Sequence, residues 1–147
     1  MRTFLRRLTR NDARADELAQ EVFLRVFQMG ARWREVDDER AYLYRLAYRR
    51  FLDDHRRDAR REALRQGEVA GPDSHGPSGA ARLDIARAMD TLPPERRACA
   101  LLCLALGHSH ADASRILDLP LGTVKSHVAR AKSALQAQLS AYKGALS

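Results

Sequence analysis

The chain has 147 residues, of which 45% are hydrophobic and 31% charged, a length and balance that suit one ordinary domain or two very small ones. Its formal net charge of +7 at pH 7 is typical of proteins that bind a polyanion such as nucleic acid. No apolar run is long enough to span a bilayer and the first residues lack the apolar core of a signal peptide, so we expect a soluble cytoplasmic protein without membrane insertion.

Two helices are predicted before Gly30, in a stretch that contains no proline and no alternating strand pattern. A short helix lies within residues 1–10, and Asn11 or Asp12 either ends it or caps the next one. The second helix covers residues 14–29 and stops at a break around Gly30. One stripe of this helix is apolar at helical spacing. The positions expected to face inward are Leu18, Ala19, Val22, Phe23, Val26 and Phe27.

A third helix, long and basic, is predicted over residues 39–61. Asp37 or Asp38 offers a side chain that can cap its first turn. Its inward stripe is expected to consist of Leu43, Leu46, Ala47 and Phe51.

Residues 66–80 then change the character of the chain. The stretch QGEVAGPDSHGPSGA holds four of the eight glycines and two of the five prolines with almost no large apolar residue, which is the composition of a flexible linker. We therefore predict an all-α protein of two small helical domains, residues 1–63 and 82–147, joined by a flexible linker at residues 64–81.

The second domain begins with a predicted helix over residues 82–92. The pair Pro93 and Pro94 breaks it and suits the first turn of a new helix over residues 94–106. Gly107 is expected to end that helix, because glycine adopts the left-handed backbone of a helix C-terminus without strain.

A helix-turn-helix closes the domain, which makes it a four-helix unit. Ser109 and Asp112 resemble a capping box for a short helix over residues 110–117, and residues 118–122 (DLPLG) form a turn before a last helix capped by Thr123. The apolar stripe expected to be buried is Val124, Val128, Ala131, Leu135 and Leu139. The residues then turned outward are Lys125, Ser126, Ala129, Arg130 and Ser133.

The outward face of this last helix has the properties of a helix that reads DNA. It combines small side chains, which allow close approach, with cationic and hydrogen-bonding ones. It also starts at a helix N-terminus, whose amides favour phosphate. Any amphipathic helix has a polar face, but the preceding short helix and turn, and the lack of acidic residues after Asp118, favour DNA binding.

Two separate motifs resemble one protein family. The stretch LPPERRACALLCLALGHSHADASRILDLPLGTVKSHVARAKSAL resembles region 4 of extracytoplasmic-function sigma factors, a short group of the sigma-70 family. The stretches DELAQEVFLRVF and RAYLYRLAYRRFLDDHRR resemble region 2 of the same family, in the family's order. The resemblance implies a factor that binds core RNA polymerase and promoter DNA, is held by an anti-sigma factor, and directs transcription initiation.

The resemblance also implies roles for individual residues. In region 4, the outward residues of the last helix would read the minus-thirty-five element, and these are Lys125, Ser126 and Arg130, with Thr123 and His127 at the edge. In region 2, the residues implied in minus-ten recognition and melting are Trp33, Tyr42, Arg45, Arg49, Arg50, Arg56 and Arg57. The face implied in binding core polymerase is Asp16, Glu17, Gln20, Glu21, Leu24 and Arg25.

Aromatic residues support the implied role of region 2. Five of the nine aromatic residues lie between positions 33 and 51, where arginines are also dense, and single-stranded bases bind by stacking and cation attraction. The five are Trp33, Tyr42, Tyr44, Tyr48 and Phe51. Trp33 and Tyr42 are equally compatible with a place in the core.

The chain departs from the family pattern at several places. It begins about half a helix later than the family usually does, so we expect a short first helix. Arg49 stands where asparagine is frequent, and Asp118 where the turn usually has glycine, although aspartate tolerates left-handed backbone better than most residues. Ala113 and Ser114 are expected to thin the packing of the short helix.

Other chemistry finds little support. Cys103, His108 and His110 fit no standard zinc spacing and lack a fourth ligand. Cys99 and Cys103 lie four apart in an apolar helical run, which favours buried thiols in a reducing compartment. No phosphate loop or nucleophile motif is present, so we expect neither an enzyme nor a cofactor.

Two other functions remain possible from the residues alone. A stand-alone regulator with a LuxR-like output domain would share the TVKSHV helix, but its first half should show alternating strands and helices. An architectural or RNA-binding basic protein would bind without sequence preference and without polymerase.

Overall fold

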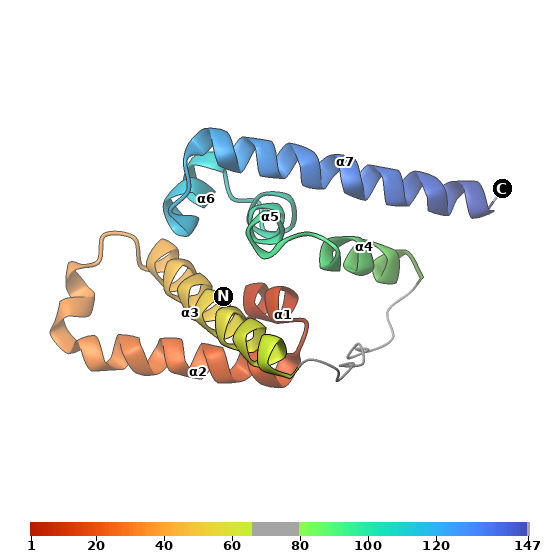
Figure 1. Cartoon of the computed structure of the whole chain (residues 1–147). Coiled ribbons are helices and arrows are strands. Elements are labelled where there is room, and N and C mark those ends of the chain that lie inside the picture. The colour runs from red at the N-terminus through yellow and green to blue at the C-terminus, as the bar shows by residue number, and fades with distance from the viewer. Residues whose placement is uncertain (66–79, 147) are drawn as a thin grey trace. The chain divides into compact units, whose positions relative to one another are not determined.

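The computed structural model describes residues 1–65 and 80–146, and within these ranges every regular element is a helix. The chain divides into two compact units, residues 1–75 and 76–147 (Figure 1). Most of the linker predicted at residues 64–81 lies outside the described residues. The predicted fold class, two helical parts of an all-α protein, is confirmed. None of the described helices is both long and apolar enough to cross a membrane.

The first unit consists of α1 (Arg2–Thr9), α2 (Asp12–Met29), the 3-10 helix η1 (Gly30–Glu35) and α3 (Glu39–Leu64). Two of the predicted caps are confirmed, because the Asn11 side chain accepts the Arg14 amide and that of Asp38 accepts the Ala41 amide, both at 3.0 Å. Asparagine and aspartate at these positions satisfy amides that the first turn leaves without helical partners.

The three α-helices pack against one another, and the core lies where they meet. The short helix α1 contributes more than its length suggests, since Phe4, Leu5 and Leu8 are all at most 1% exposed. Phe4 meets Tyr44 of α3 edge to face, with ring centroids 5.4 Å apart. This geometry is one of the favoured arrangements of aromatic pairs.

Two of the predicted inward stripes need correction. Phe23 and Phe27 of α2 are 57% and 84% exposed, because within the described part of the first unit α1 lies beside the beginning of α2 only (Figure 1). In α3 the buried stripe is shifted by about one residue from the predicted one, so Leu43 and Leu46 are only partly buried. The buried apolar residues of α3 are Tyr44, Ala47, Tyr48 and Phe51.

The second unit consists of α4 (Ala80–Asp90), α5 (Pro94–Ala100), the π-helical turn η2 (Leu101–Ala105), α6 (His110–Leu117) and α7 (Leu121–Leu146). Helix α7 packs against α4, α5 and α6, so it organises this unit (Figure 1). The helix predicted over residues 94–106 is α-helical only in its first half, because α5 ends at Ala100 and the π-helical turn η2 follows. Gly107, with φ of 75°, follows its last turn as predicted.

A buried arginine joins α4 to α5. Arg97 is 9% exposed, and its guanidinium donates to the carbonyl oxygens of Met89, Asp90 and Leu92 at 3.0–3.1 Å. The last carbonyls of a helix have no helical partner, so a buried cation at this end satisfies both hydrogen bonding and the helix dipole. This arginine stabilises the turn between α4 and α5, where Pro93 and Pro94 lie.

Candidate nucleic-acid interface

The turn between α6 and α7 is built by side-chain and backbone contacts. Ser109 caps α6 as predicted, because its hydroxyl accepts the Asp112 amide at 3.0 Å. Asp118 ends α6 in the left-handed region with φ of 55°, the conformation that aspartate was expected to tolerate. Ser114 donates its hydroxyl to the Leu119 carbonyl at 2.5 Å. Ser114, which was expected to weaken the packing of α6, therefore stabilises the turn through this hydrogen bond.

Helix α7 begins three residues earlier than predicted, at Leu121 instead of Val124. The amide of Val124 donates to the Pro120 carbonyl at 3.1 Å, so the first turn starts at Leu121. The prediction that Thr123 caps the helix is wrong, because the helix begins at Leu121, directly after Pro120. Thr123 lies inside the first turn and is partly buried.

The two faces of α7 separate as the spacing predicts. Val124 and Ala131 are 0% exposed and Val128 is 7% exposed, whereas Leu135 and Leu139 are only partly buried. The outward residues are all exposed, and they are Lys125, Ser126, Ala129, Arg130 and Ser133. A cationic surface with small side chains therefore lies on the second helix of a helix-turn-helix, the position from which such helices enter the major groove.

His127 lies differently from these neighbours. Its side chain is 16% exposed, and its Nε2 atom lies 3.0 Å from Oε2 of Glu95 in α5. The other ring nitrogen, Nδ1, is buried without a hydrogen-bond partner. Sequence spacing alone cannot place this ring, because Glu95 is 32 residues away along the chain.

The aromatic residues of the first unit divide into two groups. Tyr44, Tyr48 and Phe51 are at most 5% exposed and belong to the core, so they are not available to stack on bases. Trp33 of η1 and Tyr42 of α3 are partly exposed and meet edge to face, with centroids 5.8 Å apart. Of the five aromatic residues between positions 33 and 51, only Trp33 and Tyr42, the two that the resemblance implies in melting, are left available for stacking.

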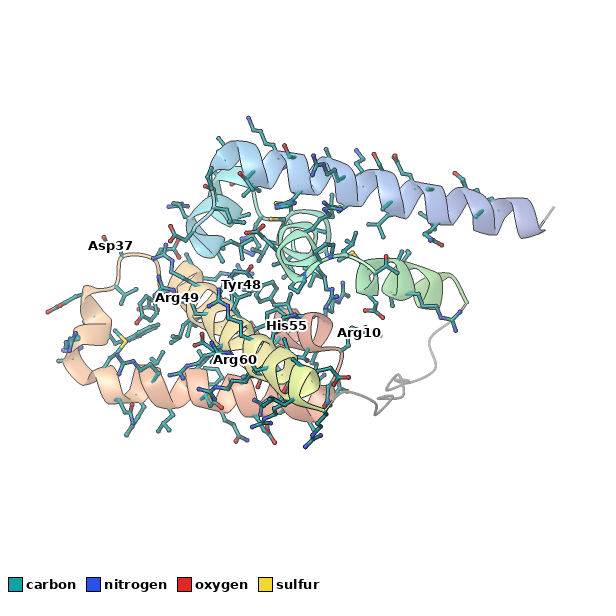
Figure 2. The ribbon with its side chains drawn as sticks, viewed as in Figure 1. Arg10, Asp37, Tyr48, Arg49, His55 and Arg60 are labelled. Atoms are coloured by element: carbon teal, nitrogen blue, oxygen red, sulfur yellow. The ribbon has the colours of Figure 1, made fainter. Side chains whose placement is uncertain are left out.

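The arginines that the resemblance implies in minus-ten recognition lie along α3, the helix that carries the labelled residues Arg49, His55 and Arg60 in Figure 2. Arg49, Arg56 and Arg57 are exposed, whereas Arg45 and Arg50 are partly buried. Arg50 also lies 3.9 Å from Glu21 of α2. The exposed arginines extend a positive surface toward the end of α3.

The predicted polymerase face of α2 carries ion pairs at its beginning. Arg2 holds Asp16 through two hydrogen bonds of 2.6 and 2.9 Å, and this guanidinium keeps the pKa of Asp16 below its usual value. Arg14 pairs with Glu17 at 2.6 Å and also with Asp54 of α3, which is 7% exposed. The pair of Arg2 with Asp16 joins α2 to α1, and the pair of Arg14 with Asp54 joins it to α3. The rest of the face is accessible.

The exposed apolar residues of α2 were missed by the sequence reasoning. Phe23 lies three residues after Gln20, and Phe27 lies four residues after Phe23. The three side chains therefore share one line along the helix. Leu24, which was predicted to lie on this face, is 57% exposed. The short first helix was the available signal, since eight residues form about two turns and cannot cover an apolar stripe of about three turns, from Leu18 to Phe27.

The two cysteines are free thiols, but only Cys99 is buried as predicted, and Cys103 is partly exposed. Cys99 is fully buried, and burial raises the pKa of its thiol to about 12. An inert buried thiol behaves as a small apolar side chain. Across residues 1–65 and 80–146, no group of three or more possible ligands is placed to hold a metal ion.

Known proteins resemble the chain in both units. The model of sigma-70 region 2 matches residues 1–61, and that of sigma-70 region 4 matches residues 82–135. The ECF RNA polymerase sigma factor EcfG of Rhodopseudomonas palustris is 32% identical over 95% of this chain and 78% of its own length. SigE of Mycolicibacterium smegmatis is 33% identical over 88% of this chain and 53% of its own length.

A solved structure agrees with these sequence relatives. The sigma factor RpoE of Bartonella quintana, in complex with the anti-sigma factor NepR, matches 95% of this chain and 89% of its own with a TM-score of 0.80 and 26% identity. Both the order of the regions and the helical architecture are therefore shared. The chain belongs to the extracytoplasmic-function RNA polymerase sigma factors, with regions 2 and 4 of the sigma-70 family.

Proposed function

We propose that this sigma factor binds core RNA polymerase through α2 and directs it to promoters that its second unit reads through α7. The observation that carries the proposal is the cationic face of α7, exposed on the second helix of a helix-turn-helix. Sigma factors are not enzymes, and the polymerase performs the chemistry. This chain supplies recognition and helps to open the duplex.

Upstream recognition is assigned to Lys125, Ser126 and Arg130. Their side chains are exposed on one face of α7, and that face begins near the helix N-terminus. Arginine and lysine bind guanine edges and phosphates, and serine donates or accepts at close range. Alanine at Lys125 or Arg130 should weaken promoter binding about tenfold, at about 1–3 kcal/mol for each good base contact. Binding to core polymerase should stay unchanged.

Recognition of the minus-ten element is assigned to Trp33, Tyr42 and the arginines of α3. Tyr42 donates its hydroxyl to the sulfur of Met29 at 3.3 Å, which holds the pair against the end of α2. Partly exposed rings that are held in place can stack on bases that leave the duplex, and exposed arginines neutralise the backbone. The arginines assigned to this role are Arg45, Arg49, Arg50, Arg56 and Arg57.

Binding to core polymerase is assigned to the face of α2, extended by the two phenylalanines. The exposed residues of this face are both polar and apolar, which is the composition of a protein interface rather than of a phosphate-binding surface. The residues assigned to it are Asp16, Glu17, Gln20, Glu21, Phe23, Leu24, Arg25 and Phe27.

Run-off transcription with purified core polymerase tests the proposed function. The template carries the region upstream of the protein's own coding sequence. The protein should bind core polymerase and produce one defined transcript, whereas core polymerase alone should not. If the protein neither binds core polymerase nor directs initiation, the proposed function is wrong.

The remaining assignments concern the setting of the protein. We place it in the bacterial cytoplasm, where its polymerase is found, and propose that an anti-sigma factor holds it inactive, as NepR binds the similar RpoE. A LuxR-like regulator is the weaker alternative, because its first half should alternate strands and helices and the described part of the first unit contains helices only.

A further inference from the structure

We propose that His127 and Glu95 form a positioning pair. Their contact fixes the rotation of α7 about its axis and thereby the direction in which Lys125, Ser126 and Arg130 point. The imidazole itself does not contact the promoter. The inference rests on the proposed function, and it changes the role of His127 from an edge contact with DNA to an internal support.

The geometry places the imidazole between two helices of the same unit. Its Nε2 lies 3.0 Å from the Glu95 carboxylate in the first turn of α5, and its side chain is 16% exposed against 47% for Glu95. An ionised carboxylate only accepts hydrogen bonds, so Nε2 donates to it. The second nitrogen, Nδ1, is buried without a partner. Neither ring nitrogen is therefore left for a phosphate or a base edge.

The position of His127 in α7 explains why such a support matters. It directly follows Lys125 and Ser126, and Arg130 lies one turn further on. A helix with its side chains has a radius of about 5–6 Å, so a rotation of about 20° moves the side-chain tips by about 2 Å. Hydrogen bonds weaken steeply over such a distance. A contact that fixes the rotation of α7 therefore fixes the positions of Lys125, Ser126 and Arg130 at the same time.

The charge of Glu95 is consistent with support rather than with contact. A carboxylate beside a phosphate-binding residue repels the DNA backbone, so it opposes binding at a direct contact. Val124, Val128 and Ala131 bury the opposite stripe of α7, but apolar packing has no directional preference of its own. The hydrogen bond from His127 to Glu95 adds a directional restraint at the edge of that packing.

The test uses reconstituted holoenzyme, the full chain with core polymerase. Its affinity is measured for the promoter fragment that directs run-off transcription, and for the same fragment with the minus-thirty-five segment scrambled. The variants are Glu95→Ala, His127→Ala, the double alanine variant, Glu95→Gln and His127→Gln. Asp118→Asn is the matched control, because it removes an exposed negative charge from the same unit without touching His127, and asparagine also tolerates left-handed backbone.

We expect each alanine variant to bind the promoter about five- to tenfold more weakly, the fold-change that corresponds to one ordinary hydrogen bond. The double variant should be no weaker than the single ones, because the two residues act as one unit. Both glutamine variants should restore binding, since an amide can donate or accept in the same place. Affinity for the scrambled fragment and the salt dependence should not change.

Three results would overturn the inference. If His127→Ala alone weakens binding and also lowers the slope of log affinity against log salt by about one, the imidazole contacts a phosphate. If Glu95→Ala strengthens binding to both fragments as Asp118→Asn does, the carboxylate acts only through its charge. If the unaltered holoenzyme does not distinguish the two fragments, upstream recognition by α7 is wrong and the inference falls with it.

Discussion

Phe27 offers a direct test of the polymerase-binding face. A phenylalanine carries about 150–250 Å² of surface that can be buried, so the exposed part of Phe27 (84%) corresponds to about 150 Å². At about 25 cal/mol per Å², complete burial against a partner is worth about 4 kcal/mol. An alanine side chain keeps part of this buried area, and ordering the phenylalanine side chain on binding costs part of the gain. We therefore expect Phe27→Ala to weaken binding to core polymerase by about 2 kcal/mol, roughly thirtyfold in Kd.

Fluorescence anisotropy of labelled protein titrated with core polymerase measures this loss. Leu64→Ala is the matched control, because Leu64 is 87% exposed at the end of α3, outside the proposed face. It should leave the affinity unchanged. The free energy of unfolding should also stay within about 0.5 kcal/mol, since Phe27 packs little in the folded protein. Equal effects of the two variants, or a loss below threefold for Phe27→Ala, would refute the reasoning.

Three further predictions concern stability. Arg97→Met should lower the free energy of unfolding in urea by about 2–4 kcal/mol, because three carbonyls, one buried and two partly buried, lose a charged donor; a loss below about 1 kcal/mol would contradict this role. Gly30→Ala should cost about 1–3 kcal/mol because its φ of 56° and ψ of −126° suit glycine alone, whereas Gly122→Ala inside α7 should stabilise slightly; similar effects at both positions would argue against backbone strain. Because Arg2 lowers the pKa of Asp16, their pair adds stability above the ordinary aspartate pKa and loses it as pH falls through the lowered value. Arg2→Gln should raise the Asp16 pKa in an NMR titration, and an unchanged value would exclude this cause.

Local signals in the sequence were reliable where the physics is local. The caps at Asn11, Asp38 and Ser109 could be predicted because a short polar side chain next to the first turn satisfies amides of that same turn. The left-handed Asp118 could be predicted from the turn in which it lies. Thr123 failed as a cap because the proline three residues earlier already defined where the helix starts.

The stripes of the first unit were less predictable, because burial depends on which helix covers which. The apolar periodicity of α2 has six members, but α1 is too short to cover all of them, so Phe23 and Phe27 remain exposed. In α3, Tyr44 is buried where Phe4 of α1 packs against its ring. Neither the exposed phenylalanines of α2 nor the shifted buried stripe of α3 can be read from the spacing of apolar residues within that helix alone.

The sequence by itself determined the helices, the order of the two units, the family and the outward face of α7, because periodicity, capping and motif order are properties of neighbouring residues. Only the tertiary structure decided which aromatic residues belong to the core, that Ser114 fastens the turn, and that Arg97 closes the corner between α4 and α5. It also brought His127 to Glu95, 32 residues away. Such contacts depend on how helices pack, and packing is set by every helix at once.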